Sequence, residues 1–324
     1  VWNRSLTVVE INQLYTTSLT KFNSTDWELS VNQSLNSTDG LVAGDYWYSV
    51  DATDGSGNLN TSEERLVSVD AVDTVLPLLE YADPTLANAS TDTDGYVDVN
   101  VSIVEANLDN VTLDWNGTDY AIYDSDVLLF LNFDNRSDLG ENASDFTDLS
   151  SYGANGTGIS FDSDEIVAGK YGGGVDFDGS NDYIAFGPPV HLKTTGSITI
   201  SAWVNPDADE SFGLVNYDDV TGTRGYGLTP GTDGTNNKWR FSLANTGNSL
   251  IKRYSTKRIL NSIGEWNHIV GVYDAGAQTM DIYVNGIEDN GVLQGTVPTE
   301  QQITGGQFRI GNFINFDADF NGQI

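Results

Sequence analysis

The residues in this sequence whose types and spacing could do chemistry are mainly acidic. The stretch FDGSNDY places Asp178, Asn181 and Asp182 in a tight turn. Clustered oxygen ligands without cysteine or histidine favour Ca²⁺ over zinc. The same residues can instead form an Asx-turn, in which the carboxylates accept hydrogen bonds from backbone amides. The sequence therefore predicts either a structural calcium site or such a turn at these positions.

Catalytic candidates are few. The chain has no cysteine, so thiolate nucleophiles, disulfides and thiolate metal sites are excluded. His191 and His268 have no serine or cysteine partner signature, and a core role is the default for His268 in WNHIVGVY. No enzymatic activity is expected.

Asparagine glycosylation motifs are concentrated in the first half of the chain. Asn-x-Ser/Thr sequons occur at Asn3, Asn23, Asn32, Asn36, Asn60, Asn88, Asn100, Asn110, Asn116, Asn135, Asn142 and Asn155. None follows Asn155, although asparagine remains frequent there, so chance in a Thr-rich sequence is a poor explanation. We expect N-linked glycans, and hence an extracellular, cell-surface location.

The overall composition is strongly acidic. Asp and Glu number 47 against 14 Lys and Arg, a net charge of -33 over 324 residues. This balance argues against nucleic acid as a partner. No segment reaches the roughly 18 apolar residues of a membrane-spanning helix.

Hydrophobic periodicity predicts strands nearly everywhere. Apolar residues alternate in SITISAWV, WNHIVGVY, TMDIYVNG and YVDVNVSI, and Gly, Asn and Asp separate these runs. One segment differs, because Thr7 with Glu10 three residues later forms a capping-box pattern in front of an apolar stripe at helical spacing. The sequence predicts an all-β chain with one short helix near the N-terminus, whose stripe must dock on something.

From about residue 127 onward the sequence resembles the laminin-G-like, concanavalin A-like jelly roll. The motifs that carry the resemblance follow in order as LLFLNFDN, GKYGGGVDFDGSNDYIAF, SITISAWVNP, WNHIVGVYD, MDIYVNGI, FRIGN and FNGQI. The resemblance implies a sandwich of two antiparallel sheets over residues 125–324. In related jelly rolls a structural calcium often lies beside the FDGSNDY turn, assisted by an acid of the closing strand that this sequence does not contain.

Two earlier blocks resemble the halves of an immunoglobulin- or fibronectin-like sandwich common in archaeal surface glycoproteins. Residues 76–124 resemble its first-half strands, and residues 16–75 resemble its second-half strands. The resemblance implies a jelly roll inserted into a sandwich. The plainer alternative is that the sandwich domains and the jelly roll each fold alone.

The first residues resemble the end of the same jelly roll. Such modules usually close with a strand of the form G-x-I-D-E-V-R-x-W-N-R-x-L and a short helix, and VWNRSL followed by the capped helix matches that end. This implies that residues 1–15 complete the jelly roll of a preceding repeat or neighbour, and that residues 125–324 lack the last strand. Val1, Trp2 and Leu6 are then interface residues.

The expected partner is therefore the protein itself, head to tail. Either one long chain carries tandem repeats, or separate subunits exchange strands, and both arrangements propagate into a filament or sheet. A basic cluster of Lys252, Arg253, Lys257 and Arg258 could dock on an acidic neighbour. It could equally be a charged, solvated strand edge.

Carbohydrate binding is the alternative function. Jelly rolls of this type include lectins, and Trp203, Trp239, Tyr217, Tyr226 and Tyr254 could stack on sugars, although aromatic residues in a sandwich more often fill the core. The fold also includes glycoside hydrolases, but the acid-bearing strand motif they need is missing here. The sequence predicts a structural repeat of a glycosylated surface protein that forms a filament, stalk or surface layer with an adhesive role, or a carbohydrate-binding adhesin module.

Overall fold

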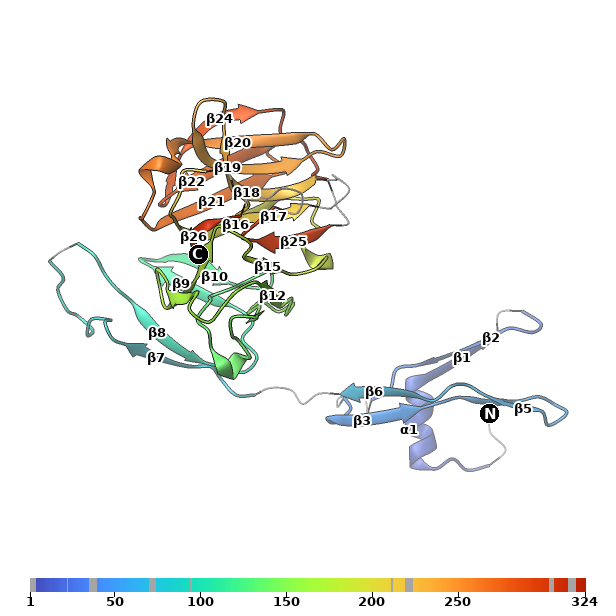
Figure 1. The fold of residues 1–324 in the computed structure, drawn as a ribbon. Coiled ribbons are helices and arrows are strands. Elements are labelled where there is room, and N and C mark those ends of the chain that lie inside the picture. Colours follow the sequence, from blue (N-terminus) through green and yellow to red (C-terminus); the bar gives the residue numbers. More distant parts are fainter. Residues whose placement is uncertain are drawn as a thin grey trace. The chain divides into compact units, whose positions relative to one another are not determined.

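The computed structural model shows an all-β chain with antiparallel strand pairing, which confirms the predicted fold class (Figure 1). It describes residues 4–21, 23–34, 40–69, 74–93, 95–210, 212–218, 224–302, 306–313 and 319–324. None of the described helices is long and apolar enough to cross a membrane.

The chain divides into two compact units, Val1–Leu108 and Asp109–Ile324. The hairpin of β9 (Val111–Trp115) and β10 (Thr118–Tyr123) belongs to the second unit, where the Tyr123 hydroxyl donates to the Leu149 carbonyl at 3.1 Å. The domain boundaries expected from the sequence stay predictions.

Helix α1 (Val8–Thr16) begins with the predicted capping box. The Glu10 amide donates to the Thr7 Oγ1, and the Thr7 amide donates to the Glu10 carboxylate at 2.8 Å. Within its own unit, however, the described apolar residues of α1 are left exposed. Val8 is 74% exposed, Ile11 54% and Tyr15 68%, so the stripe that the sequence expected to dock has no partner among the described residues of its own unit.

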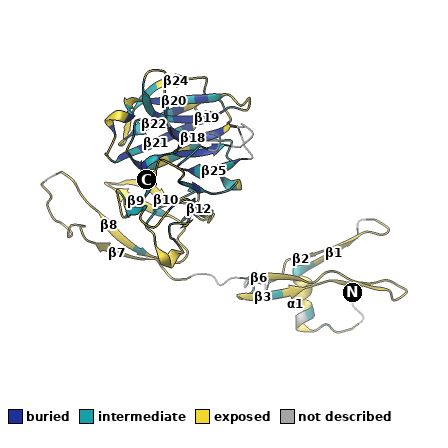
Figure 2. Cartoon of the chain, in the orientation of Figure 1, coloured by how far each residue is buried: buried dark blue, intermediate teal, exposed yellow. Residues whose placement is uncertain are grey.

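Short hairpins make up the rest of the first unit. Their strands are β1 (Thr17–Lys21) with β2 (Trp27–Val31), β3 (Gly44–Tyr48) with β6 (Arg65–Val69), β4 (Asp51–Thr53) with β5 (Leu59–Thr61), and β7 (Leu78–Ala82) with β8 (Asn100–Val104). Each pair forms its own two-stranded sheet, and among the described residues of this unit no apolar side chain is buried (Figure 2). An isolated two-stranded hairpin is marginally stable at best, so these hairpins need further packing partners.

The second unit is built from two large sheets. The nine-stranded sheet has the order β11 (Asp145–Phe146), β12 (Gly156–Ile159), β15 (Tyr183–Ala185), β25 (Gln307–Ile310), β17 (Val215–Asp218), β18 (Arg224–Thr232), β19 (Asn237–Ala244), β20 (Leu250–Arg258) and β24 (Asn290–Gln294). The seven-stranded sheet has the order β13 (Ile166–Ala168), β14 (Gly173–Asp178), β26 (Asn321–Gln323), β16 (Ile198–Pro206), β21 (Asn267–Asp274), β22 (Thr279–Val284) and β23 (Ile287–Glu288). Short 3₁₀ helices lie at η1 (Ser137–Leu139), η2 (Val190–Leu192) and η3 (Ile259–Asn261).

The core of the second unit lies between these two sheets, because alternate residues of facing strands point inward. Four core residues have no exposed surface, namely Trp239 and Phe241 on β19, Ile269 on β21 and Ile282 on β22. The predicted alternation in SITISAWV, WNHIVGVY and TMDIYVNG corresponds to β16, β21 and β22. The buried surface of the chain is concentrated here (Figure 2).

Strand β26 completes the seven-stranded sheet only in part. It lies between β14 and β16 and pairs antiparallel with both over three residues. Gly322 adopts φ 135°, and a Cβ there would lie 2.3 Å from the Asn205 carbonyl oxygen, so glycine is needed at this crossing. The sequence predicted a jelly roll without its last strand, and β26 occupies the position between β14 and β16 over three residues.

Candidate functional site

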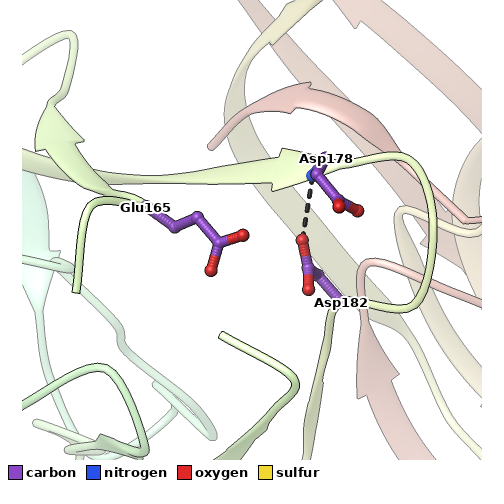
Figure 3. A group of neighbouring side chains, drawn as sticks. All are labelled: Glu165, Asp178 and Asp182. Carbon is purple, nitrogen blue, oxygen red and sulfur yellow. Dashed lines mark hydrogen bonds between the residues drawn. The ribbon is translucent and has the colours of Figure 1, made fainter. Parts of the chain in front are cut away.

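Three carboxylates gather at one edge of the seven-stranded sheet. Glu165 precedes β13, Asp178 ends β14, and Asp182 immediately precedes β15. One oxygen from each lies within 4.8 Å of the others, and Figure 3 shows the three side chains converging. The structure therefore brings together two of the three residues expected to bind calcium and adds Glu165 to them.

The turn between β14 and β15 positions the two aspartates. The Asp178 amide donates to Asp182 Oδ2 at 2.9 Å, and Asp178 Oδ1 accepts from the Ser180 amide at 2.7 Å. The second contact is the Asx-turn that the sequence also allowed, so the turn is present whether or not an ion binds. Asn181 is exposed in this turn and is not part of the cluster.

The electrostatics of the cluster favour a cation. Asp182 is 1% exposed, and this burial, together with the charges of Glu165 and Asp178, raises its pKa to about 6. Burial and then the neighbouring Asp207, Glu165 and Asp178 also raise the pKa of Asp176. Carboxylates crowded in this way repel one another. An all-oxygen donor set fits Ca²⁺ better than a transition metal.

Glu165 was not among the metal ligands predicted from the sequence. It reaches the cluster because β13 and β14 form a hairpin, in which the Asp176 amide donates to the Glu165 carbonyl at 2.8 Å. The glycine-rich GKYGGG between these strands was the available signal. Pairing Ile166 with Val175 across that turn would have placed Glu165 beside β14.

A second candidate site is an unpaired edge of β16. All seven residues Ile198–Val204 pair with β21 on one side, but on the other side β26 pairs only with Asn205 and Pro206. The Asp207 amide points toward β26, because it donates to the Asn321 carbonyl at 3.0 Å. Backbone amides along a strand point alternately to its two sides. The amides of Thr199, Ser201 and Trp203 therefore point to the same side as that of Asp207, which is the open side. Among the described residues, no strand pairs with this part of the edge.

Residues 127–134 also lack strand pairing, although their sequence is typical of a strand. The run VLLFLNFD is apolar enough for a strand, and Leu128, Leu131 and Phe133 pack against the core, yet the segment is not in a strand. The amide of Leu149 donates to the Phe130 carbonyl at 2.8 Å, and Asp148 Oδ1 accepts from the Phe130 amide at 3.0 Å. This contact with the 148–150 segment does not extend into a ladder.

The other expected interface residues are placed as follows. Val1 and Trp2 lie outside the described residues, and Leu6 is half-buried. Lys252, Arg253, Lys257 and Arg258 all lie on β20 but do not form one patch, because successive side chains of a strand point to opposite faces. The Arg253 side chain reaches β22 of the seven-stranded sheet, where its Nε donates to the Met280 carbonyl at 2.7 Å.

Most of the candidate sugar-stacking aromatic residues are buried. Trp239, Tyr217, Tyr226 and Tyr254 are at most 5% exposed, which confirms the structural interpretation for these four. Trp203 differs, since it lies on the outer face of the seven-stranded sheet. Tyr171, 71% exposed, packs edge-on against it at 5.7 Å between ring centroids, and Lys170 Nζ lies 5.2 Å from the Trp203 ring.

The two histidines lie in different surroundings. His191 stacks on Tyr152 with ring centroids 4.3 Å apart. His268 Nε2 lies 2.8 Å from the Ser201 hydroxyl, a contact that the sequence did not predict, and burial lowers the pKa of His268. Within the described part of the chain, no carboxylate is hydrogen-bonded to this imidazole, so the pair lacks the orienting third group of a nucleophilic triad.

The sequons are accessible wherever the structure describes them. Asn3 and Asn36 lie outside the described residues, and the ten other sequon asparagines are all exposed. Asn116 and Asn135 occupy turns with positive φ, a conformation that asparagine tolerates. Accessibility is the condition that glycosylation requires.

Comparison with known proteins gives a match for the C-terminal part of the chain. Residues 178–324 match the family model Laminin_G_3, described as the concanavalin A-like lectin/glucanases superfamily. This region is less than half of the chain. No curated protein matches the sequence.

Two solved structures are similar at low identity. The native heptameric SAP-like pentraxin from Limulus polyphemus has a TM-score of 0.34 and 16% identity, over 46% of this chain and 71% of that chain. A tryptophan-to-alanine mutant of HCR/D has a TM-score of 0.37 and 14% identity, over 54% of this chain and 44% of that chain. The family match confirms the laminin-G-like, concanavalin A-like resemblance for residues 178–324, a fold that suggests a carbohydrate-binding or structural module.

Proposed function

We propose that this chain is a structural repeat of a glycosylated extracellular surface protein, joined head to tail through strand addition to its jelly roll. The observation that carries the proposal is the unpaired edge of β16. Unpaired amides and carbonyls in the middle of a sheet are a template for another strand.

The occupant that we propose is the segment VWNRSL at residues 1–6 of another copy. Its six residues are one fewer than the seven residues of β16 that lack a partner on that side, so it could cover most of the open edge. Helix α1 follows directly and carries an apolar stripe that its own unit leaves exposed. Docking of strand and helix together would satisfy both the open edge and the uncovered stripe.

Two further parts of the proposal, glycosylation and calcium binding, are based on the other candidate sites. Exposure of the ten described sequon asparagines supports N-linked glycans and an extracellular, cell-surface location. The cluster of Glu165, Asp178 and Asp182 would hold a structural Ca²⁺ that neutralises the crowded carboxylates.

A proline substitution in β16 tests the assembly. The Ser201 amide faces the open side, so Ser201→Pro removes no hydrogen bond to β21, whereas it blocks one needed by an added strand. We expect the variant to keep its thermal unfolding midpoint within a few degrees and to lose self-association, measured by sedimentation velocity and electron microscopy. The matched control is Ser201→Ala, which loses the hydroxyl contact with His268 but keeps the amide and should assemble normally.

Self-association of the Ser201→Pro variant to the same extent as the wild type would contradict the proposal. If that variant is itself unfolded, a labelled peptide of residues 1–16 added to the wild-type chain decides, because it must compete with assembly. The mass of the native polypeptide separates the two arrangements, since tandem repeats require far more than 35.1 kDa in one chain.

The second candidate function is a carbohydrate-binding adhesin module. It is favoured by the exposed Tyr171 beside Trp203, and by the match of residues 178–324 to a family of lectins and glucanases. A glycan array probed with the wild-type chain and with Tyr171→Ala tests it. Loss of a glycan signal in the variant would support sugar stacking at this position.

A further inference from the structure

The hairpin of β9 and β10 (Figure 1) has one apolar face and one polar face. Its register places Leu113, Trp115 and Tyr120 on one side, because paired residues of a hairpin point the same way. Two aspartates, Asp114 and Asp119, lie opposite each other on the other side. The three apolar side chains are between 41% and 50% exposed, so the described residues leave this face uncovered.

The end of this hairpin that leads into the jelly roll is fixed to it. The Tyr123 hydroxyl donates to the Leu149 carbonyl at 3.1 Å, and the Tyr123 ring lies 6.3 Å from that of Phe130, between centroids. The hairpin therefore presents its apolar face from a defined attachment point. Large apolar side chains that are exposed together mark an interaction surface, and a two-stranded sheet is marginally stable without a packing partner.

Attached glycans do not provide the cover. Asn110 directly precedes β9, and Asn116 lies in the turn between β9 and β10. In the hairpin of β1 and β2, Asn23 likewise lies in the turn, and Asn32 directly follows β2. N-linked glycans at these positions would flank both hairpins and leave their faces free for protein contacts.

The hairpin of β1 and β2 has the same division into two faces. Its apolar face consists of Leu19, Trp27, Leu29 and Val31, which are 41% to 63% exposed. Its polar face consists of Ser18, Thr20, Glu28 and Ser30. Of the other described hairpins in the first unit, β3 with β6 and β7 with β8 expose large apolar side chains on both faces, and β4 with β5 exposes only Leu59. The hairpin of β1 and β2 is thus the one that needs cover on a single side.

We propose that the apolar face of β1 and β2 in one copy packs on the apolar face of β9 and β10 in the next copy. This inference rests on the strand addition proposed above. Helix α1 ends at Thr16 and β1 begins at Thr17, so a copy whose residues 1–16 are docked on a jelly roll holds β1 within the length of α1, about 14 Å. The hairpin of β9 and β10 is attached to that same jelly roll. Two sheets stacked about 10 Å apart bury one face of each.

Cysteine labelling tests this interface, because the chain has no cysteine of its own. Leu113→Cys places a thiol on the apolar face of β9, and Thr112→Cys is the matched control on the opposite face. We expect self-association to slow maleimide labelling of Leu113→Cys at least roughly tenfold, because labelling then requires opening of the interface. The unassembled reference is the same substitution combined with Ser201→Pro. Thr112→Cys should react equally fast in both states.

If Ser201→Pro does not fold, the reference is the assembling chain with excess peptide of residues 1–16, which fills the edge of β16 but lacks β1 and β2. The partner face is identified by mixing chains that carry Leu29→Cys with chains that carry Leu113→Cys and adding a thiol cross-linker of about 10 Å, the spacing of stacked sheets. We expect mixed cross-linked dimers, and none when Ser30→Cys replaces Leu29→Cys.

The outcomes separate this interface from the strand addition. A wild type that does not self-associate refutes both. Self-association without slower labelling of Leu113→Cys refutes the hairpin interface alone. Slow labelling of Leu113→Cys already in the unassembled chain also refutes it, because the chain's own residues would then cover the face.

Discussion

Asp182 is a carboxyl group that the fold buries next to two other acids. Its raised pKa, about 6, means that without a cation its contribution to folding becomes less favourable as the pH rises from the unfolded value near 3.9 through about 6. A bound Ca²⁺ would reverse this, because it stabilises the ionised form. The residue is thus the most sensitive reporter of the proposed ion site.

We expect Ca²⁺ to raise the unfolding midpoint of the wild type at pH 7.5 and to do nothing for Asp182→Asn. A hundredfold excess over the Kd should raise the midpoint by about 5 to 10 °C. The shift should be smaller at pH 5, where Asp182 is mostly protonated. Differential scanning calorimetry with added CaCl₂ or chelator measures it.

Asp138→Asn is the matched control for the ion site. Asp138 is exposed in η1, and its ion pair with Arg136 at 3.3 Å contributes little to stability. This variant should keep the full response to Ca²⁺. Equal responses of the wild type and Asp182→Asn would rule the site out.

At the scale of elements, the start of α1 depends on a small hydrogen-bond network. The Glu10 carboxylate accepts from the Arg4 guanidinium and the Thr7 amide, and these contacts lower the pKa of Glu10 to about 2. The network therefore stabilises the helix above the unfolded value of about 4.3 and is lost as the pH falls toward 2.

NMR titration of the Glu10 carboxyl group checks this element. In the wild type we expect its midpoint near 2, and in Arg4→Ala a clear upward move, because the contact that lowers the pKa most is gone. Thr7→Ala should also reduce the helical signal, since loss of such a cap costs about 1 kcal/mol. A wild-type midpoint at the unfolded value would show that the capping box does not form in solution.

Elements with strong local signals could be predicted from the sequence. The capping box gave α1, and alternation gave β16, β21 and β22 because one face of each is buried. The run 127–134 looked equally apolar but is not in a strand, since pairing depends on a neighbour that local sequence does not reveal.

In the candidate sites, too, only the residues that lie close together in the sequence could be predicted. Asp178 and Asp182 share one turn and could be found by spacing, whereas Glu165 arrives through a hairpin. The basic cluster of β20 looked like one patch in the sequence, but strand alternation sends Lys252 and Arg253 to opposite faces. The charge of Arg240 acts on Lys252 because β19 pairs with β20, and no spacing along the chain encodes that pairing.

At the scale of the whole molecule, the dominant quantity is charge. The net charge of -33 makes the chain repel itself, which opposes compaction and close approach of further copies. Screening shortens the range of this repulsion from about 10 Å at 0.1 M salt to about 3 Å at 1 M. Head-to-tail assembly by a highly acidic protein therefore requires salt or divalent cations to offset the repulsion.

We expect the unfolding midpoint and the degree of self-association both to rise as NaCl increases from roughly 0.1 to 1 M. The control is the same titration near pH 4.1, the isoelectric point, where net repulsion vanishes and the stabilising effect of salt should largely disappear. An equal rise in the midpoint at both pH values would assign the effect to surface exclusion of the salt, and self-repulsion would then not limit this protein.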